Sequence, residues 1–124
     1  MYKIPFLDVG SSYRELREEI DSAVYRVLAS GRYVQGEEVE SFESNFAAFV
    51  EAQHCVGVAN GLDAIYLALR ALGVGVGDEV IVPAHTFIAT WLAVTNCGAT
   101  PVPVEPELDG FNIDPTLIEA AITK

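Results

Sequence analysis

Short apolar runs alternate with helix-forming segments from His54 onward, and this alternation limits the fold of the 124-residue chain more than any other feature. Strand–helix alternation is typical of a three-layer α/β fold with mostly parallel strands. The runs lack polar alternation, which indicates a sheet covered on both faces. The pattern predicts strands at Cys55–Ala59, Glu79–Val82 and Pro101–Val104, and helices at Asp63–Leu72, Thr86–Asn96 and from Asp114 to the end.

Two amphipathic helices are expected ahead of this α/β part. Ser12–Glu15 has capping-box spacing and predicts a helix that reaches about Ser30, where Gly31 supplies a left-handed stop. A second helix is expected after residue 36, with apolar residues at helical spacing up to Val50. We therefore predict an N-terminal helical segment over residues 1–52, packing on a large domain whose first part spans residues 53–124.

The net charge of −11, with only seven Lys and Arg residues, excludes a nucleic-acid footprint. Two histidines and no CxxC spacing leave a metal site without support. Cys55 and Cys97 lie in apolar runs and are predicted to be buried free thiols of a reducing compartment. The chain shows no signal peptide, and its longest apolar stretch, Phe87–Val94, is too short to span a bilayer. We expect a soluble cytoplasmic protein.

A glycine turn between a strand and a helix, Val56–Ala64, carries the most chemical information. A helix N-terminus presents unpaired N–H groups and the positive end of its dipole, so it can bind a phosphate without basic side chains. Gly61 would permit a close approach of the backbone to the ligand, and Asp63 would cap the helix. The same residues are also an ordinary way to begin a helix, and that alternative stays open at this point.

A second segment ends the next strand at Pro83 and places His85, Thr86 and Phe87 at its carboxyl end. Ligands of open α/β sheets bind at the carboxyl ends of strands, and an aromatic ring there can stack on a flat cofactor. Taken singly, Phe87 could instead be a core residue and His85 a loop histidine.

Together these segments resemble the DegT/DnrJ/EryC1/StrS family of sugar aminotransferases, which are fold-type I pyridoxal-phosphate enzymes. The resemblance extends over essentially the whole chain in the order of the family. It rests on IPFLD at Ile4–Asp8, SGRYVQGEEVESFE at Ser30–Glu43, NGLDA at Asn60–Ala64, GDEVIVPAHTFIAT at Gly77–Thr90, GATPV at Gly98–Val102 and FNIDP at Phe111–Pro115.

The resemblance implies the fold of the aminotransferase large domain, incomplete in this chain, and a set of site residues. The turn at Gly61, Leu62 and Asp63 matches the one that binds the cofactor phosphate, and Phe87 matches the aromatic residue that stacks on the pyridine ring. Tyr33, Gln35 and His85 are assigned to the nucleotide-sugar site, which is often shared across a dimer interface.

The resemblance further implies a dTDP-linked deoxysugar as substrate, glutamate as amino donor and a homodimer. The apolar content of 51% also favours a partner surface.

Transamination needs a lysine that holds the cofactor, and the only lysines, Lys3 and Lys124, do not follow a strand end near the phosphate turn. In the family this lysine and its acidic partner come later than the position of residue 124. We therefore expect that these 124 residues do not transaminate by themselves.

Three alternatives to a sugar aminotransferase are compatible with parts of the sequence or can be compared with it. A deoxysugar dehydratase of the same family replaces the lysine by histidine, at a position outside this sequence. A non-catalytic binding or assembly module would keep the fold without the chemistry. A Rossmann-type nucleotide binder requires a glycine-rich fingerprint and an acidic residue after the second strand, and neither is present.

Overall fold

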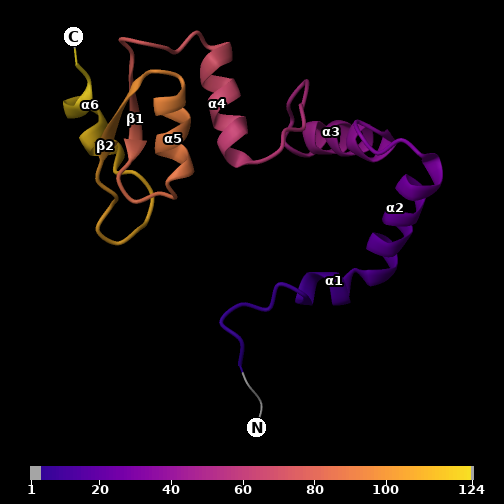
Figure 1. Ribbon diagram of the computed structural model, residues 1–124. Coiled ribbons are helices and arrows are strands. Elements are labelled where there is room, and N and C mark those ends of the chain that lie inside the picture. Colours follow the sequence, from indigo (N-terminus) through magenta and orange to yellow (C-terminus); the bar gives the residue numbers. More distant parts are fainter. Residues whose placement is uncertain (1–3, 124) are drawn as a thin grey trace. The chain divides into compact units, whose positions relative to one another are not determined.

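The structure is a computed structural model that describes residues 4–123 (Figure 1). It divides into two compact units, Met1–Gly57 and Val58–Lys124, which are described one at a time below. The division at residues 52 and 53 predicted from the sequence stays a prediction. Lys3 and Lys124, on which the expectation about catalysis was based, lie outside the described residues.

The N-terminal unit contains α1 (Ser11–Glu15), α2 (Arg17–Ser30) and α3 (Glu37–Phe49). One continuous helix from Ser12 was predicted, but Leu16 (φ −105°, ψ 22°) interrupts it. The predicted capping box was also wrong, because no side chain caps α1. Asp8 organises this turn instead: its carboxylate accepts from the Gly10 N–H at 3.1 Å, and its carbonyl accepts from the Ser11 hydroxyl at 2.9 Å.

The apolar faces of these helices stay uncovered within their own unit. Gly31 ends α2 in the left-handed region (φ 67°), as predicted. On α3 the Phe42 and Phe46 rings lie 5.5 Å apart, and both rings remain about half exposed. Among the described residues of this unit only Ala47 is buried. The predicted apolar stripes are present on α2 and α3, and within residues 4–57 they remain largely exposed.

The C-terminal unit is an α/β arrangement around two parallel strands. In chain order it contains α4 (Gly61–Ala71), β1 (Glu79–Pro83), α5 (Ala89–Asn96), β2 (Thr100–Val104), the 3₁₀ helix η1 (Pro115–Leu117) and α6 (Ile118–Ala121). The strands pair from Glu79↔Thr100 to Pro83↔Val104. Helix α5 packs on both strands and α4 packs on α5, while Figure 1 shows the strands lying between α5 and α6.

The strand predicted at Cys55–Ala59 is absent from the described structure. Val56 is 78% exposed, and the Gly57 N–H donates to the Glu43 carboxylate at 2.7 Å rather than to a neighbouring strand. An apolar run forms a strand only where a second backbone offers partners, and the run itself does not supply them. The last predicted helix was also too long, because α6 ends at Ala121.

The core of this unit lies between α5 and the two strands. Val82, Val94, Cys97 and Ala99 form a buried cluster, with the half-buried Trp91 packed against it. Burial of Val82 and Val94 contributes about 1.5–3 kcal/mol each to folding. Cys97 is a buried free thiol, as predicted, whereas Cys55 is free but only half-buried, so the prediction of burial was wrong for it.

Two prolines make β2 an edge strand. Thr100 donates its N–H toward the β1 side, to the Asp78 carbonyl at 2.9 Å. Because N–H groups alternate in direction along a parallel strand, positions 101 and 103 face away from β1. Both are proline, so β2 loses no bond to β1 but has no donor there for a strand on its other side. The free edge of β1 is therefore the side on which the sheet can grow.

Substitution of Gly98, which lies between α5 and β2, should destabilise this unit. Gly98 has φ +83°, and a Cβ atom there would come within 2.9 Å of a Val76 methyl carbon. We expect Gly98→Ala to lower the free energy of unfolding by about 1–3 kcal/mol. Gly75→Ala is the matched control, because a Cβ atom there meets nothing closer than 3.9 Å. Equal denaturant midpoints for the two variants would contradict this account.

Candidate functional site

Asn60 caps the N-terminus of α4. It is extended (φ −163°, ψ 174°), and its side-chain oxygen accepts from the Asp63 N–H at 2.9 Å. Its side-chain nitrogen donates to the Asp63 carboxylate at 3.0 Å. Asp63 was predicted to be the cap, and this was wrong because the helix begins at Gly61, which places Asp63 inside the first turn.

The cap leaves two backbone donors free. Asn60 occupies the Asp63 N–H through its side chain and the Ala64 N–H through its carbonyl, at 3.1 Å. Within residues 4–123, the N–H groups of Gly61 and Leu62 have no hydrogen-bond partner. A Cβ atom on Gly61 would meet no atom within 4 Å, so the backbone is open to a ligand there. Two adjacent donors at the positive end of a helix are suited to an oxyanion.

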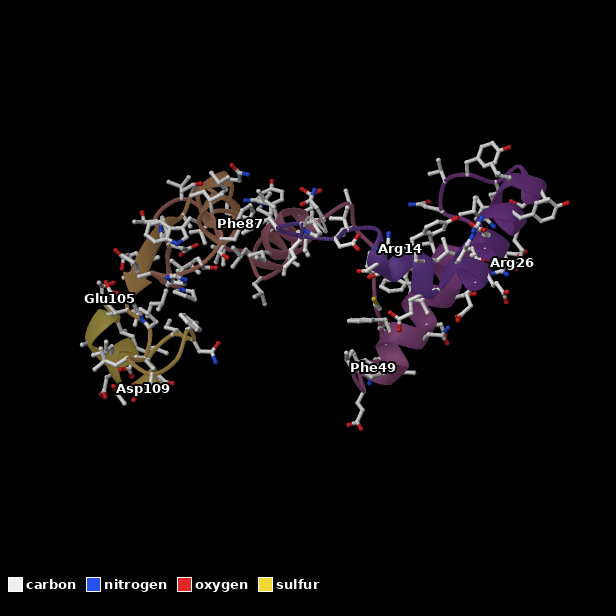
Figure 2. All side chains as sticks on the ribbon, turned by 90° about the horizontal axis from the view of Figure 1, so that it is seen from below. Arg14, Arg26, Phe49, Phe87, Glu105 and Asp109 are labelled. Atoms are coloured by element: carbon white, nitrogen blue, oxygen red, sulfur yellow. The ribbon has the colours of Figure 1, made fainter. Side chains whose placement is uncertain are left out.

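Phe87 lies at the carboxyl end of the sheet, in the segment between β1 and α5 (Figure 2). Its side chain is 80% exposed, which excludes the alternative that it belongs to the core of this unit. The pairing between the strands continues to Ala84, shortly before Phe87, because the Ala84 N–H donates to the Val104 carbonyl at 2.8 Å.

The beginning of α4 lies toward the same end of the unit. A connection over residues 72–78 joins the end of α4 to the start of β1, so the helix runs opposite to the strand. Figure 1 shows the β1 arrow pointing toward the end at which α4 begins. The free donors and the exposed ring therefore share the edge where ligands of α/β sheets bind.

His85 lies beside an aromatic ring that was not among the predicted site residues. Its exposed ring lies 5.8 Å from the Phe111 ring, with 40° between the planes. Phe111 comes from the loop after β2, which a bridge between Pro106 and Ile113 closes. Figure 2 marks this loop by Glu105 and Asp109. The FNIDP segment matches the family only as a flanking motif, so no signal in the sequence singled out Phe111.

Tyr33 and Gln35 lie in the N-terminal unit. Tyr33 lines a hollow of about 240 Å³ between the end of α2 and the start of α3, together with residues that include Arg26, Arg32 and Glu38. Gln35 does not line it, and instead adopts a left-handed backbone conformation (φ 50°). For a residue other than glycine this conformation is strained, and such strain is often found at functional loops.

Both arginines that line this hollow are paired with glutamates. Arg26 donates to Glu38 at 2.7 Å, and Arg32 donates to Glu40 at 3.1 Å. The hydrogen bond from Arg26 lowers the pKa of the Glu38 carboxyl, and the same bond raises the pKa of Arg26. These pairs are exposed to water, so they orient the guanidinium groups more than they stabilise the fold.

The structure thus groups five of the seven predicted site residues in the C-terminal unit and two in the N-terminal unit. Gly61, Leu62 and Asp63 share the first turn of α4, while His85 and Phe87 share the loop after β1. Asn60, which caps this turn, was not among the predicted site residues, although an Asn directly before a helix is a recognised cap signal.

Within residues 4–123, no helix is long and apolar enough to cross a bilayer. No three His, Cys, Asp or Glu side chains of these residues converge as metal ligands would.

Comparison with known proteins identifies the family. The model of the DegT/DnrJ/EryC1/StrS aminotransferase family matches residues 14–124. A dTDP-3-amino-3,4,6-trideoxy-alpha-D-glucose transaminase from Streptomyces venezuelae is 60% identical, over 98% of this chain and 32% of the relative. The erythromycin biosynthesis sensory transduction protein EryC1 of Saccharopolyspora erythraea is 61% identical, over 97% of this chain and 33% of the relative.

Solved structures agree with the sequence relatives. The crystal structure of S. venezuelae DesV in complex with a ketimine intermediate superposes with a TM-score of 0.94 at 59% identity, covering 99% of this chain and 33% of that one. NtdA from Bacillus subtilis with bound cofactor PMP gives a TM-score of 0.90 at 37% identity, covering 99% of this chain and 28% of that one. The chain thus spans about a third of the length of these proteins. The chain belongs to the DegT/DnrJ/EryC1/StrS aminotransferase family.

Proposed function

We propose that this chain supplies the phosphate-binding turn and the ring-stacking residue of a pyridoxal-phosphate-dependent transaminase that acts on a keto group of a dTDP-linked deoxysugar. The observation that carries the proposal is the pair of free N–H groups at Gly61 and Leu62, at the same end of the unit as the exposed Phe87. The names of related proteins, among them a dTDP-sugar transaminase, support the substrate class. PMP, bound to one structural relative, is the amine form of the same cofactor.

The residues of the turn fit a phosphate monoester. The two free amides and the dipole of an 11-residue helix offset part of its charge, and Gly61 leaves room for its oxygens. Asp63 is the unfavourable element, because a carboxylate in the first turn repels a phosphate. The Asn60 amide, which donates to this carboxylate at 3.0 Å, holds it in a fixed position and offsets part of its charge.

Phe87 fits the heteroaromatic ring of the cofactor. An isolated phenyl ring that is 80% exposed has no packing role within its unit, and stacking on a flat ring gives it one. When bound, pyridoxal phosphate supplies the electron sink through which an amino group passes from donor to sugar. The role of the described residues is to bind the phosphate, to orient the cofactor ring and to limit the access of water to one face of that ring.

Tyr33, Gln35 and His85 are proposed to contact the nucleotide sugar. The hollow lined by Tyr33, the strained backbone of Gln35 and the exposed His85–Phe111 pair support this assignment. Glutamate as donor, a homodimer and a cytoplasmic location complete the proposal. Uncovered apolar side chains on α2 and α3 support assembly, and two free cysteines support a reducing compartment.

Activity of the full-length protein tests the substrate class. We expect it to aminate a dTDP-linked 3-keto-6-deoxyhexose with glutamate and pyridoxal phosphate, as measured by mass spectrometry of the product. Tyr33→Ala should raise the KM for the sugar several-fold and leave cofactor affinity unchanged. Tyr25→Ala is the matched control, because Tyr25 is similarly exposed (73% against 68% for Tyr33) and does not line the hollow. Failure to aminate any such sugar would contradict the proposal.

Cofactor affinity tests the role of the turn. Asn60→Ala removes the cap and releases the Asp63 carboxylate toward the phosphate. We expect pyridoxal phosphate to bind more weakly by about 1 kcal/mol or more, which is roughly fivefold in Kd.

Asn60→Ser separates the two effects in the same absorbance titration. Serine keeps the cap but cannot donate as the amide does, so its Kd should lie between those of Asn60→Ala and the unchanged protein. If the Asn60→Ala protein binds the cofactor with an unchanged Kd, the turn does not belong to the cofactor site and the proposal is contradicted.

A further inference from the structure

The segment that carries Phe87 is held on both sides although the ring itself is exposed. Before it, the Trp91 indole N–H donates to the Pro83 carbonyl at 3.2 Å. Across it, the hydroxyl groups of Thr86 and Thr90 share a hydrogen bond of 2.9 Å. The Phe87 carbonyl accepts from the Thr90 N–H at 3.1 Å. Phe87 therefore lies inside a small closed loop of bonds that links the end of β1 to the first turn of α5.

The bond between the two hydroxyl groups differs from what threonine usually does in a helix. A helical threonine hydroxyl commonly donates to a backbone carbonyl one turn earlier, and Thr95 of the same helix does so, to the Leu92 carbonyl at 3.1 Å. Thr90 bonds instead to a side chain in the preceding loop. It does not serve as a cap, because α5 begins after Ile88 without a side-chain cap.

We propose that Thr90, acting through Thr86, is a positioning residue that holds the Phe87 ring in place for the cofactor. Thr86 and Thr90 are half-buried, whereas Phe87 points into solvent. The hydroxyl pair and the backbone bond at Thr90 restrain the backbone that carries the ring, so less backbone freedom is lost when the ring stacks on a ligand. This inference rests on the proposed function, since it requires a flat cofactor at Phe87.

The test compares variants of the full-length protein for binding of pyridoxal phosphate. Thr90→Val removes the hydroxyl with little change in shape and should raise the Kd roughly three- to tenfold, the range expected when the backbone of about one residue must be ordered on binding. Thr90→Ser should restore most of the affinity. Thr95→Val is the matched control, because it removes a threonine hydroxyl of the same helix that bonds only to the Leu92 carbonyl.

A double-mutant cycle with Phe87→Leu separates positioning from general stability. If Thr90 acts through the ring, Thr90→Val should change the Kd little once the ring is absent. Full additivity of the two substitutions would overturn the proposal, as would an unchanged Kd for Thr90→Val. Thr86→Val breaks the same bond from its other side and gives a second variant if Thr90→Val folds poorly.

The cycle also separates this inference from the proposed function. An unsubstituted protein that binds no pyridoxal phosphate, or an affinity that Phe87→Leu leaves unchanged, would contradict the proposed site. Cofactor binding that depends on Phe87 but not on Thr90 would contradict the positioning role alone.

Discussion

The candidate site depends on how Asn60 begins α4. A helix N-terminus has four backbone N–H groups without a partner in the helix. A ligand can bind there only to those that no side chain or other backbone group already bonds. Asn60 uses its side chain for the Asp63 N–H and its carbonyl for the Ala64 N–H, and leaves those of Gly61 and Leu62 free. The same side chain donates to the only acidic group of that turn. One residue therefore sets the number of free donors and restrains the charge that would oppose an anion.

The core of the C-terminal unit positions the first turn of α4 relative to the sheet. Val82, Val94, Cys97 and Ala99 join α5 to the strands, and α4 packs on α5. Because α4 runs opposite to β1, its first turn lies toward the end where the strand leads to His85 and Phe87. Pro101 and Pro103 leave the outer side of β2 without donors at these positions, so the sheet can extend only along β1.

Local signals predicted local structure well. The left-handed Gly31 that ends α2 was found at its predicted place, because a helix stop depends on neighbours in sequence. The strands at 79–83 and 100–104 were found within a residue of their predicted bounds, because each supplies the other with a backbone partner. The strand at 55–59 was wrong because pairing needs a distant backbone. The break at Leu16 had no glycine or proline to mark it. Phe111 reaches His85 only through the folding of the loop after β2, which sequence spacing does not reveal.

A crystal structure of the full-length protein with pyridoxal phosphate tests the central claim most directly. The account predicts phosphate oxygens at about 2.7–3.2 Å from the backbone nitrogens of Gly61 and Leu62, with the Asn60 cap intact and the Phe87 ring against the pyridine. A phosphate bound away from the first turn of α4, or a cofactor whose ring faces do not meet Phe87, would contradict it.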